Sequence, residues 1–368
     1  MLSRIRLYLK NFDWLILAAV ILLITFSLVE IYSVALGQEN FSLLNFKKQL
    51  FFAIIGIGLL FLFSFIDAYS LKSLSIYFYL FGIIILVAVL IFGSVVKGTK
   101  GWFNIGGFGL QPVEFVKFIL ILFLAKYFSG LATKIKTSRH FLVSAFSTFV
   151  FVFLVLLQPD FGSALILAAI WLIMIIAAGF PKKYFIIIGV AAAIIFVISW
   201  FFLFKPYQKD RILTFINPTA NSLEAGYNIS QAMIAVGSGG LTGKGVGFGS
   251  QSQLKFLPEA QSDFIFAVIA EELGLLGVLL ILSFYSLFFF RCIAAIRRVN
   301  DDFGIYFIIG AAGLIFVQMF INIGMNMGIM PVVGLPLPFV SYGGSSLLSL
   351  LILVGVIENI IIKSKISY

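Results

Sequence analysis

The chain has 368 residues, of which 62% are hydrophobic and only 11% are charged, and its formal net charge is +10. Soluble domains are about half apolar and about a quarter charged, so this composition excludes a water-soluble globular protein and indicates a membrane protein. The excess of basic residues is typical of cytoplasmic loops that face anionic lipid, and no basic domain lies outside the apolar segments, so a nucleic-acid partner is not expected.

Apolar stretches recur along the whole chain, and a transmembrane helix needs about 20 such residues. The first stretch follows Arg4, Arg6 and Lys10, which indicates a cytoplasmic N-terminus, and it is too long for the apolar core of a cleaved signal peptide. The predicted spans are 13–35, 50–66, 74–93, 113–131, 141–157, 162–179, 184–204, 263–290, 303–326 and 345–362.

This pattern predicts an all-α polytopic membrane protein with about ten transmembrane helices, which form one integral-membrane domain over residues 1–368. Most Lys and Arg residues of the loops then lie on the side of the N-terminus, so both termini are expected to be cytoplasmic. One long segment, 205–262, separates the seventh and eighth helices and is expected to be extracytoplasmic.

The long segment contains a glycine-rich run, 237–249, that could be mistaken for a phosphate-binding loop. A Walker A loop needs a Gly six residues before its Lys and a Ser or Thr after it, but Ser238 and Gly245 occupy those places around Lys244. The single histidine, His140, and the single cysteine, Cys292, leave little for histidine-based metal sites, catalytic triads or disulfides.

Ionisable residues at membrane depth are costly, so each is a candidate functional residue. Glu114 and Lys117 are three residues apart on the fourth span, so they share a helix face and can pair. Asp160 follows Gln158 and Pro159 at the outer end of the fifth span. A buried structural pair is the alternative interpretation of Glu114 and Lys117.

Three carboxylates belong to the start of the eighth span. Asp263 is predicted to open this helix, with Glu271 and Glu272 two turns deeper. At 100° per residue, Glu271 would lie about 80° around the axis from Asp263 and Glu272 about 180°. We therefore expect Glu271 to share a cavity with Asp263 and Glu272 to face elsewhere. The alternative is structural, because the helix dipole favours carboxylates near an N-terminus.

Two uncharged or weakly charged segments are rich in glycine or proline. Residues 330–344 contain too many prolines for a regular helix, and irregular backbone near a membrane must line a cavity or be covered by protein. With the glycines of 101–107, this segment predicts a walled cleft on the outer side. From the residues alone, the cleft holds carboxylates and basic groups but indicates no particular reaction.

Several long motifs resemble the SEDS family (shape, elongation, division and sporulation). Residues 257–277 read LPEAQSDFIFAVIAEELGLLG, 336–346 read PLPFVSYGGSS, 111–114 read QPVE and 158–162 read QPDFG, and all four are similar to signatures of that family. The resemblance covers nearly the whole chain. The stretches 207–212, 243–245 and 251–254 are similar to the RodA branch more than to the FtsW branch. The chain departs from the family pattern at Gly101, Val113 and Gln261, which affects only the detailed arrangement of side chains in the cleft.

The resemblance implies a peptidoglycan glycosyltransferase that polymerises lipid II on the outer face of the bacterial cytoplasmic membrane, for cell elongation and shape. The reaction would join a sugar 4-hydroxyl to the anomeric carbon of a glycan held on undecaprenyl pyrophosphate. A class B penicillin-binding protein, the transpeptidase that crosslinks the strands, would be the partner, and membrane lipid the surroundings. Two alternatives remain, a lipid II flippase and a division-specific polymerase of the FtsW type, and a third is a scaffold without activity.

By the same resemblance, Asp263 would be the catalytic carboxylate, acting as general base on the hydroxyl. Arg211 and Lys244 would offset charge on the pyrophosphate, alone or with a divalent cation; no residue is expected to be a dedicated metal ligand. The residues expected to contact the substrate are Glu114, Lys117, Trp102, Asp160, Arg211, Lys244, Glu271 and Ser341.

Overall fold

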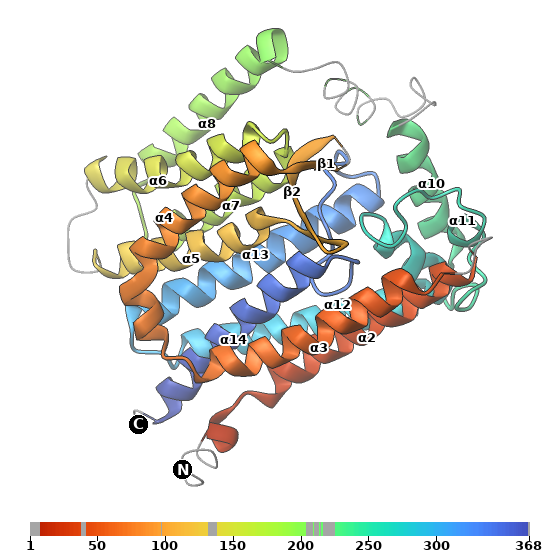
Figure 1. The fold of residues 1–368 in the computed structure, drawn as a ribbon, viewed down its shortest axis with the longest axis horizontal. Helices are drawn as coiled ribbons and strands as arrows, with labels where there is room; N and C mark the ends of the chain where they lie inside the picture. The colour runs from red at the N-terminus through yellow and green to blue at the C-terminus, as the bar shows by residue number, and fades with distance from the viewer. Residues whose placement is uncertain are drawn as a thin grey trace.

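The computed structural model describes residues 8–37, 42–96, 98–131, 138–203 and 225–366, with the single positions 209, 213 and 215. It is a bundle of long helices (Figure 1). These helices are α2 (Trp14–Leu36), α3 (Leu44–Phe65), α4 (Ala68–Phe92), α5 (Pro112–Ser129), α6 (Ser138–Leu156), α7 (Phe161–Ala177), α8 (Lys182–Ile198), α12 (Ile265–Ile296), α13 (Asp302–Asn326) and α14 (Gly344–Ile366).

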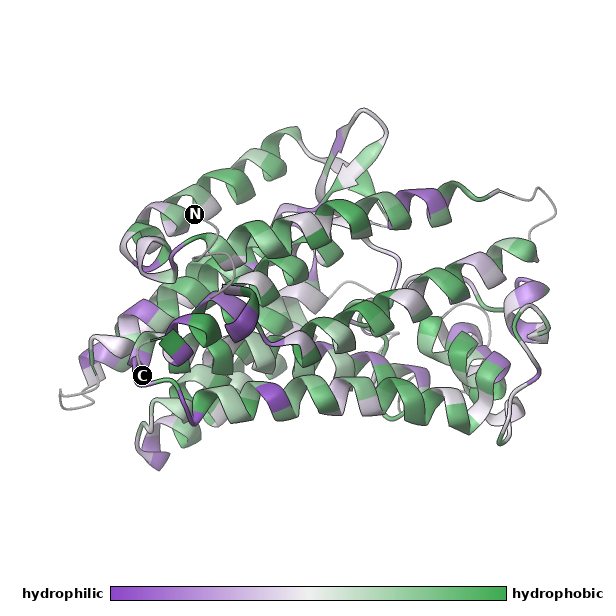
Figure 2. Cartoon of the chain, turned by 90° about the horizontal axis from the view of Figure 1, so that it is seen from below, coloured by the Kyte–Doolittle hydropathy of each residue, from purple (hydrophilic) through white to green (hydrophobic). Residues whose placement is uncertain are grey.

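The helices confirm the predicted all-α membrane fold. Each predicted span coincides with one of the long helices, and eight of these are long and apolar enough to cross a membrane. The other two are α7, which is apolar but shorter, and α5, which contains Glu114, Lys117 and Lys126. Figure 2 shows that hydrophobic residues cover the length of the helices and that hydrophilic ones gather at their ends. The chain is therefore a multi-pass membrane protein.

The centre of the bundle is formed by α14, because 83% of its most apolar stretch is buried, and it packs along α3. Helix α13 packs against α5 and α7, and α12 packs against α2. Helix α8 lies at the edge of the bundle, where Tyr184 is its one buried residue (Figure 1).

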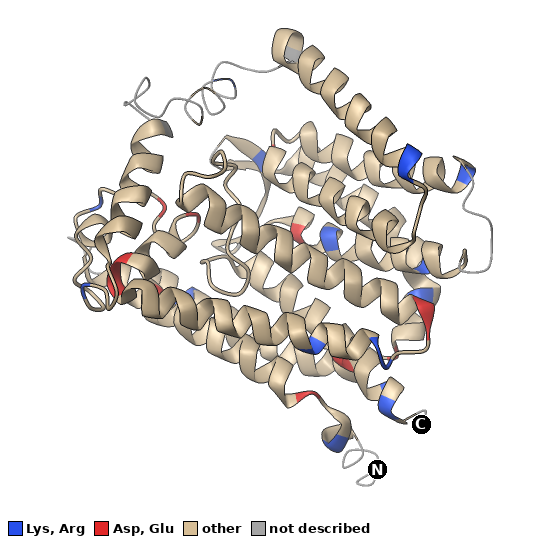
Figure 3. Cartoon of the chain, turned by 180° about the vertical axis from the view of Figure 1, so that it is seen from behind, with Lys and Arg blue, Asp and Glu red and all other residues tan. Residues whose placement is uncertain are grey.

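Both termini lie at the same end of the bundle (Figure 1), which agrees with an even number of membrane crossings. Buried polar contacts join the elements there. Arg291 forms an ion pair with Asp13, whose backbone N–H donates to Glu358 Oε2 at 3.0 Å. Lys and Arg residues occupy several loops at this end (Figure 3).

At the opposite end, the connections are longer and carry structure of their own. A three-stranded antiparallel sheet links α4 to α5 and was not predicted; it consists of β1 (Ser94–Val96), β2 (Thr99–Ile105) and β3 (Phe108–Leu110), with Phe103 opposite Leu110. The predicted loop 205–262 contains two helices, α10 (Ala225–Ser238) and α11 (Ser250–Gln253). The prediction for residues 330–344 is confirmed, since this segment is irregular as far as Gly343.

Close packing of α14 on α3 depends on Gly355. A Cβ atom at Gly355 would lie 2.5 Å from the backbone oxygen of Leu60, whereas a Cβ at Gly58 of α3 would meet nothing within 4 Å. We expect Gly355→Ala to lower the stability of the protein by about 1–3 kcal/mol, the usual cost of overpacking. Gly58→Ala is the matched control and should be neutral or stabilising, because Ala favours a helix by about 1 kcal/mol over Gly. Thermal unfolding in detergent measures both, and equal melting temperatures would contradict the packing argument.

Candidate active site

A cavity of about 1270 Å³ opens at the end of the bundle opposite the termini. Its walls come from the small sheet, the end of α2, the N-terminal ends of α3, α5, α7 and α14, the segment 252–263 and the irregular segment 331–343. These are the segments in which the sequence placed its motifs, so the cleft that they predicted is present. Among the predicted site residues, Trp102, Glu114, Asp160 and Asp263 line it.

Asp263 lies at the cavity wall, just before α12 begins at Ile265. Its backbone oxygen accepts hydrogen bonds from the side-chain amides of Asn322 and Asn326, at 3.0 and 3.1 Å. A Cβ atom at Gly334 would lie 3.5 Å from Asp263 Oδ2, so the carboxylate lies beside the irregular segment, and both residues line the cavity. Two amides on α13 thus fix the backbone of this residue, while its side chain is presented to the cavity.

Ser341 supports the same wall from behind. Its hydroxyl donates to the backbone oxygen of Ser262 and accepts from the backbone N–H of Leu337 at 2.7 Å. Nearby, the N–H of Tyr342 donates to the backbone oxygen of Gln261 at 2.8 Å. Ser341 is buried and does not line the cavity. Its hydroxyl therefore stabilises the backbone of the wall and does not face the cavity.

Glu114 and Lys117 form the predicted pair on α5. Lys117 Nζ lies 2.7 Å from Glu114 Oε1, and both side chains are almost completely buried. Glu114 lines the cavity and Lys117 lies behind it. The backbone oxygen of Glu114 also accepts from Ser349 on α14 at 2.7 Å. The cavity floor therefore has a neutralised carboxylate rather than a free negative charge.

Asp160 joins two of the sequence motifs. Its carboxylate caps α7 by accepting from the N–H and hydroxyl of Ser163, at 2.9 and 2.8 Å, and it also accepts from Gln111 Nε2 at 3.2 Å. The QPVE and QPDFG motifs thus meet at the cavity. On β2, Trp102 presents its ring to the same space beside Gly109, where a Cβ atom would approach the ring within 3.1 Å.

The expectation that Glu271 shares a cavity with Asp263 is wrong. Glu271 is fully buried, does not line the cavity, and forms an ion pair of 2.8 Å with Lys244. The helical angle between Glu271 and Asp263 does not apply, because the chain from 260 to 264 is a turn and becomes helical only at Ile265. Lys244 also lies away from the cavity lining. Arg211 falls outside the described residues.

Other polar residues of the cavity were missed by the sequence reasoning. Lys48 and Lys255 are the cations that line it within the described part of the chain. Lys48 Nζ donates to the backbone oxygen of Gly107 at 3.0 Å and lies 5.5 Å from the Phe108 ring centre. Glu259 lines the wall beside Asp263, and its place in the LPE motif was a usable signal. No sequence signal identified Lys48, because its position beside the small sheet depends on how α3 packs in the folded chain.

The described residues contain no group of three or more His, Cys, Asp or Glu side chains placed to hold a metal ion. Asp263 and Glu259 are nonetheless carboxylates of the same wall segment, and both line the cavity. Mg²⁺ in enzymes is often held by one or two carboxylates together with phosphates of the substrate, so these two residues fit a cation that arrives with a diphosphate.

Comparison with known proteins assigns the family. The family model described as "Cell cycle protein", which covers FtsW, RodA and SpoVE, matches residues 13–366. The chain belongs to this family. Peptidoglycan glycosyltransferase MrdB of Escherichia coli K12 is 42% identical over 77% of this chain and 76% of its own length. Stage V sporulation protein E of Bacillus subtilis is 37% identical over 95% of this chain and 96% of its own length.

Solved structures of this family share the fold. RodA of Thermus thermophilus has a TM-score of 0.72 at 27% identity, covering 95% of this chain and 96% of that one. A chain from a structure on "coordination of polymerization and crosslinking by a peptidoglycan synthase complex" has a TM-score of 0.79 at 28% identity, covering 97% and 98%. The SEDS resemblance of the motifs is thus confirmed.

The buried pair on α5 gives a prediction. Removing one member of a buried ion pair leaves the other unpaired, at a cost of about 3–5 kcal/mol. We expect Glu114→Gln and Lys117→Met each to reduce folded yield or activity, and the double variant to lose less than the sum of the two. Denaturation and activity of the four proteins measure the coupling free energy, and strict additivity would show that the two side chains do not interact.

Proposed function

We propose that this chain polymerises lipid II into glycan strands at the outer face of the cytoplasmic membrane, with Asp263 as its general base. Membership of the family and relatives named peptidoglycan glycosyltransferase, among them MrdB and the FtsW of Thiomicrospira cyclica, make it an enzyme of that class. The observation that carries the role of Asp263 is its position, with the backbone held by two amides and the residue lining the cavity beside Gly334.

The reaction joins two lipid-linked glycans. The acceptor 4-hydroxyl attacks the anomeric carbon of the donor, its proton passes to the Asp263 carboxylate, and the bond from the anomeric carbon to the diphosphate oxygen breaks. A single carboxylate acting as base in a direct displacement inverts the anomeric centre, as in inverting glycosidases. No second carboxylate is needed, because the acceptor hydroxyl is itself the nucleophile and the diphosphate leaves without protonation by a general acid.

Negative charge develops on the diphosphate as it leaves, and fixed cations lower the energy of that transition state. Lys48 on α3 and Lys255 in the segment after α11, which both line the cavity, would perform this role in place of Lys244, which is engaged with Glu271. A divalent cation held by Asp263 and Glu259 would, when bound, offset the same charge. Trp102, Glu114 and Asp160 would shape the cavity around the sugar, and Glu271, Lys117 and Ser341 would act on it only through other residues.

Orientation and partner are part of the proposal. The cavity lies at the end opposite the termini, so cytoplasmic termini put the cavity on the outer side, where lipid II is polymerised. A class B penicillin-binding protein is the proposed partner, supported by the similarity to a chain of a peptidoglycan synthase complex. Because the relatives include MrdB, an FtsW and a stage V sporulation protein, the RodA-type role rests on the motifs quoted above.

Replacing Asp263 tests the chemistry. Asp263→Asn keeps the size of the side chain and removes the base, so the fold should survive while polymerisation slows by about 10²–10⁴-fold. Asp302→Asn, at an exposed position at the other end of the molecule, is the matched control and should keep the wild-type rate. Glycan-strand formation from purified lipid II is followed for each purified protein at equal thermal stability.

The outcomes of this assay separate the alternatives. Near wild-type polymerisation by Asp263→Asn would make Asp263 a structural residue. If the wild type forms no strands but moves lipid II across liposomes, the protein is a flippase, and if it does neither, a scaffold.

The orientation has its own test. In a Cys292→Ser background, cysteines are placed at Leu241 and Asn300, which are exposed at opposite ends of the molecule. We expect an impermeant thiol reagent on intact spheroplasts to label Leu241→Cys and not Asn300→Cys, because the positive-inside rule places the Asn300 loop in the cytoplasm. The reverse pattern would place the cavity on the cytoplasmic side and contradict an outer active site.

A further inference from the structure

Glu271 and Glu272 are completely buried behind the cavity wall, and neither lines the cavity. Two adjacent carboxylates without solvent are costly unless their oxygens are fully bonded. Neither residue takes a direct part in the proposed reaction. Their partners therefore show what they do.

The helix that carries both residues is broken directly after them. Gly274 has φ 63° and ψ −161° inside α12, which interrupts the hydrogen bonding of the helix. The backbone of the glycine-rich run replaces the lost partners. The backbone N–H groups of Lys244 and Gly245 donate to the backbone oxygens of Glu271 and Glu272, at 3.0 and 2.9 Å. In return, the N–H groups of Leu275 and Leu276 donate to the backbone oxygens of residues 240 and 241. A Cβ atom at Gly243 would lie 2.1 Å from the Glu272 oxygen, so only glycine allows this approach.

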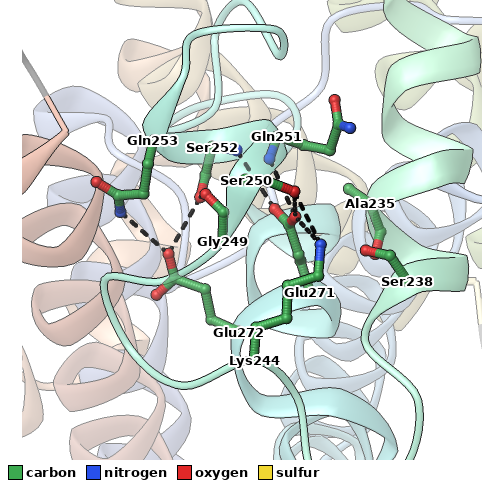
Figure 4. Close-up of polar contacts among 10 residues, drawn as sticks. All are labelled: Ala235, Ser238, Lys244, Gly249, Ser250, Gln251, Ser252, Gln253, Glu271 and Glu272. Carbon is green, nitrogen blue, oxygen red and sulfur yellow. Dashed lines mark hydrogen bonds and ion pairs between the residues drawn. The ribbon is translucent and has the colours of Figure 1, made fainter.

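The Glu271 carboxylate binds the next part of the loop (Figure 4). Oε1 accepts from Lys244 Nζ at 2.8 Å, from the Ser250 hydroxyl at 3.1 Å and from the Gln251 N–H at 3.0 Å. Oε2 accepts from the Ser252 N–H at 3.3 Å. One side chain therefore gathers both ends of the segment 244–252.

The Glu272 carboxylate completes the attachment and extends it to α2. It accepts from the Ser252 hydroxyl at 3.1 Å, from Gln253 Nε2 at 3.3 Å (Figure 4) and from the N–H of Gly247 at 3.0 Å. It also bonds the hydroxyl of Ser33 on α2, and Gln253 Nε2 donates to the backbone oxygen of Ser33 at 3.0 Å. Both carboxylates thus fix the segment 244–253 to two membrane helices.

This attachment reaches the cavity through the chain itself. Residues 254–263 follow the fixed segment, and most of them line the cavity up to Asp263. Their far end is held by Asn322, Asn326 and Ser341, as described above. The wall that carries Asp263 is therefore a short stretch clamped at both ends, and the clamp at its start is Glu271 with Glu272.

We propose that Glu271 is a positioning residue for catalysis, which holds the wall segment 254–263, and with it Asp263, at the distance that proton transfer requires. The inference rests on the proposed role of Asp263. A displacement of about 1 Å at a reacting group can lower a rate by about 10²-fold. Loss of the clamp should therefore lower kcat more than it raises KM for lipid II, because Lys255 and Glu259 move with the segment, whereas the cavity residues of α3, α5 and the small sheet stay in place.

The experiment measures kcat and KM for lipid II polymerisation by the full-length protein in four forms: wild type, Glu271→Gln, Asp263→Asn and the double variant. Glu271→Gln removes the charge that binds Lys244, and we expect kcat to fall by about 10–100-fold. In the Asp263→Asn background the same change should lower kcat by a much smaller factor than in the wild type, because Glu271 acts mainly through Asp263. Glu358→Gln is the matched control: Glu358 is a buried carboxylate on α14 at the end with the termini, where it accepts from the N–H of Asp13 at 3.0 Å, and Gln keeps that acceptor, so this change should leave kcat unaltered.

Lys244→Met gives a second way to loosen the clamp if Glu271→Gln folds poorly. The side chain of Lys244 is 30% exposed, so this variant should fold, with a smaller loss of kcat of the same kind. Wild-type kcat in both folded variants, or the same fold-loss from Glu271→Gln with Asp263 and with Asn at that position, would overturn the positioning role and leave the proposed function standing. A near wild-type rate for Asp263→Asn alone would overturn both.

Discussion

Backbone groups at membrane depth must find their hydrogen-bond partners inside the protein, and the cavity wall is built under that constraint. Its irregular segments need polar side chains that a regular helix would not. Asn322 and Asn326 bond the backbone at Asp263, and Ser341 bonds residues 262 and 337. The side chains that satisfy the irregular backbone are therefore the ones that fix the candidate catalytic residue, so stability and catalysis depend on the same contacts.

The same constraint explains why charge is divided between two places. At the cavity floor, Glu114 is neutralised by Lys117, and behind the wall Glu271 is neutralised by Lys244. Asp263, Glu259, Lys48 and Lys255 face the cavity instead, where a charged substrate can meet them. Buried pairs hold the shape of the site, and the groups at the cavity are those that the proposed reaction uses.

Helices followed from the sequence because long apolar stretches have few alternatives in a bilayer. The site followed only in part. Motifs located Glu114, Asp160 and Asp263 at the cleft, but the roles of Glu271 and Lys244 depend on a helix break at Gly274 and on a turn before Ile265. A spacing of about 100° per residue assumes an unbroken helix, so it could reveal neither the break nor the turn. Lys48 was missed because its contact with the sheet at Gly107 joins segments that are far apart in the chain.

The proposed mechanism depends on transfer of the acceptor hydroxyl's proton to the Asp263 carboxylate in the cavity. A structure of the Asp263→Asn variant with lipid II bound, determined by electron cryomicroscopy, tests it most directly. The account predicts the sugar 4-hydroxyl oxygen within about 2.6–3.2 Å of the side chain at 263, and the diphosphate between Lys48 and Lys255. Lipid II bound away from this cavity, or with its 4-hydroxyl directed away from residue 263, would contradict the account.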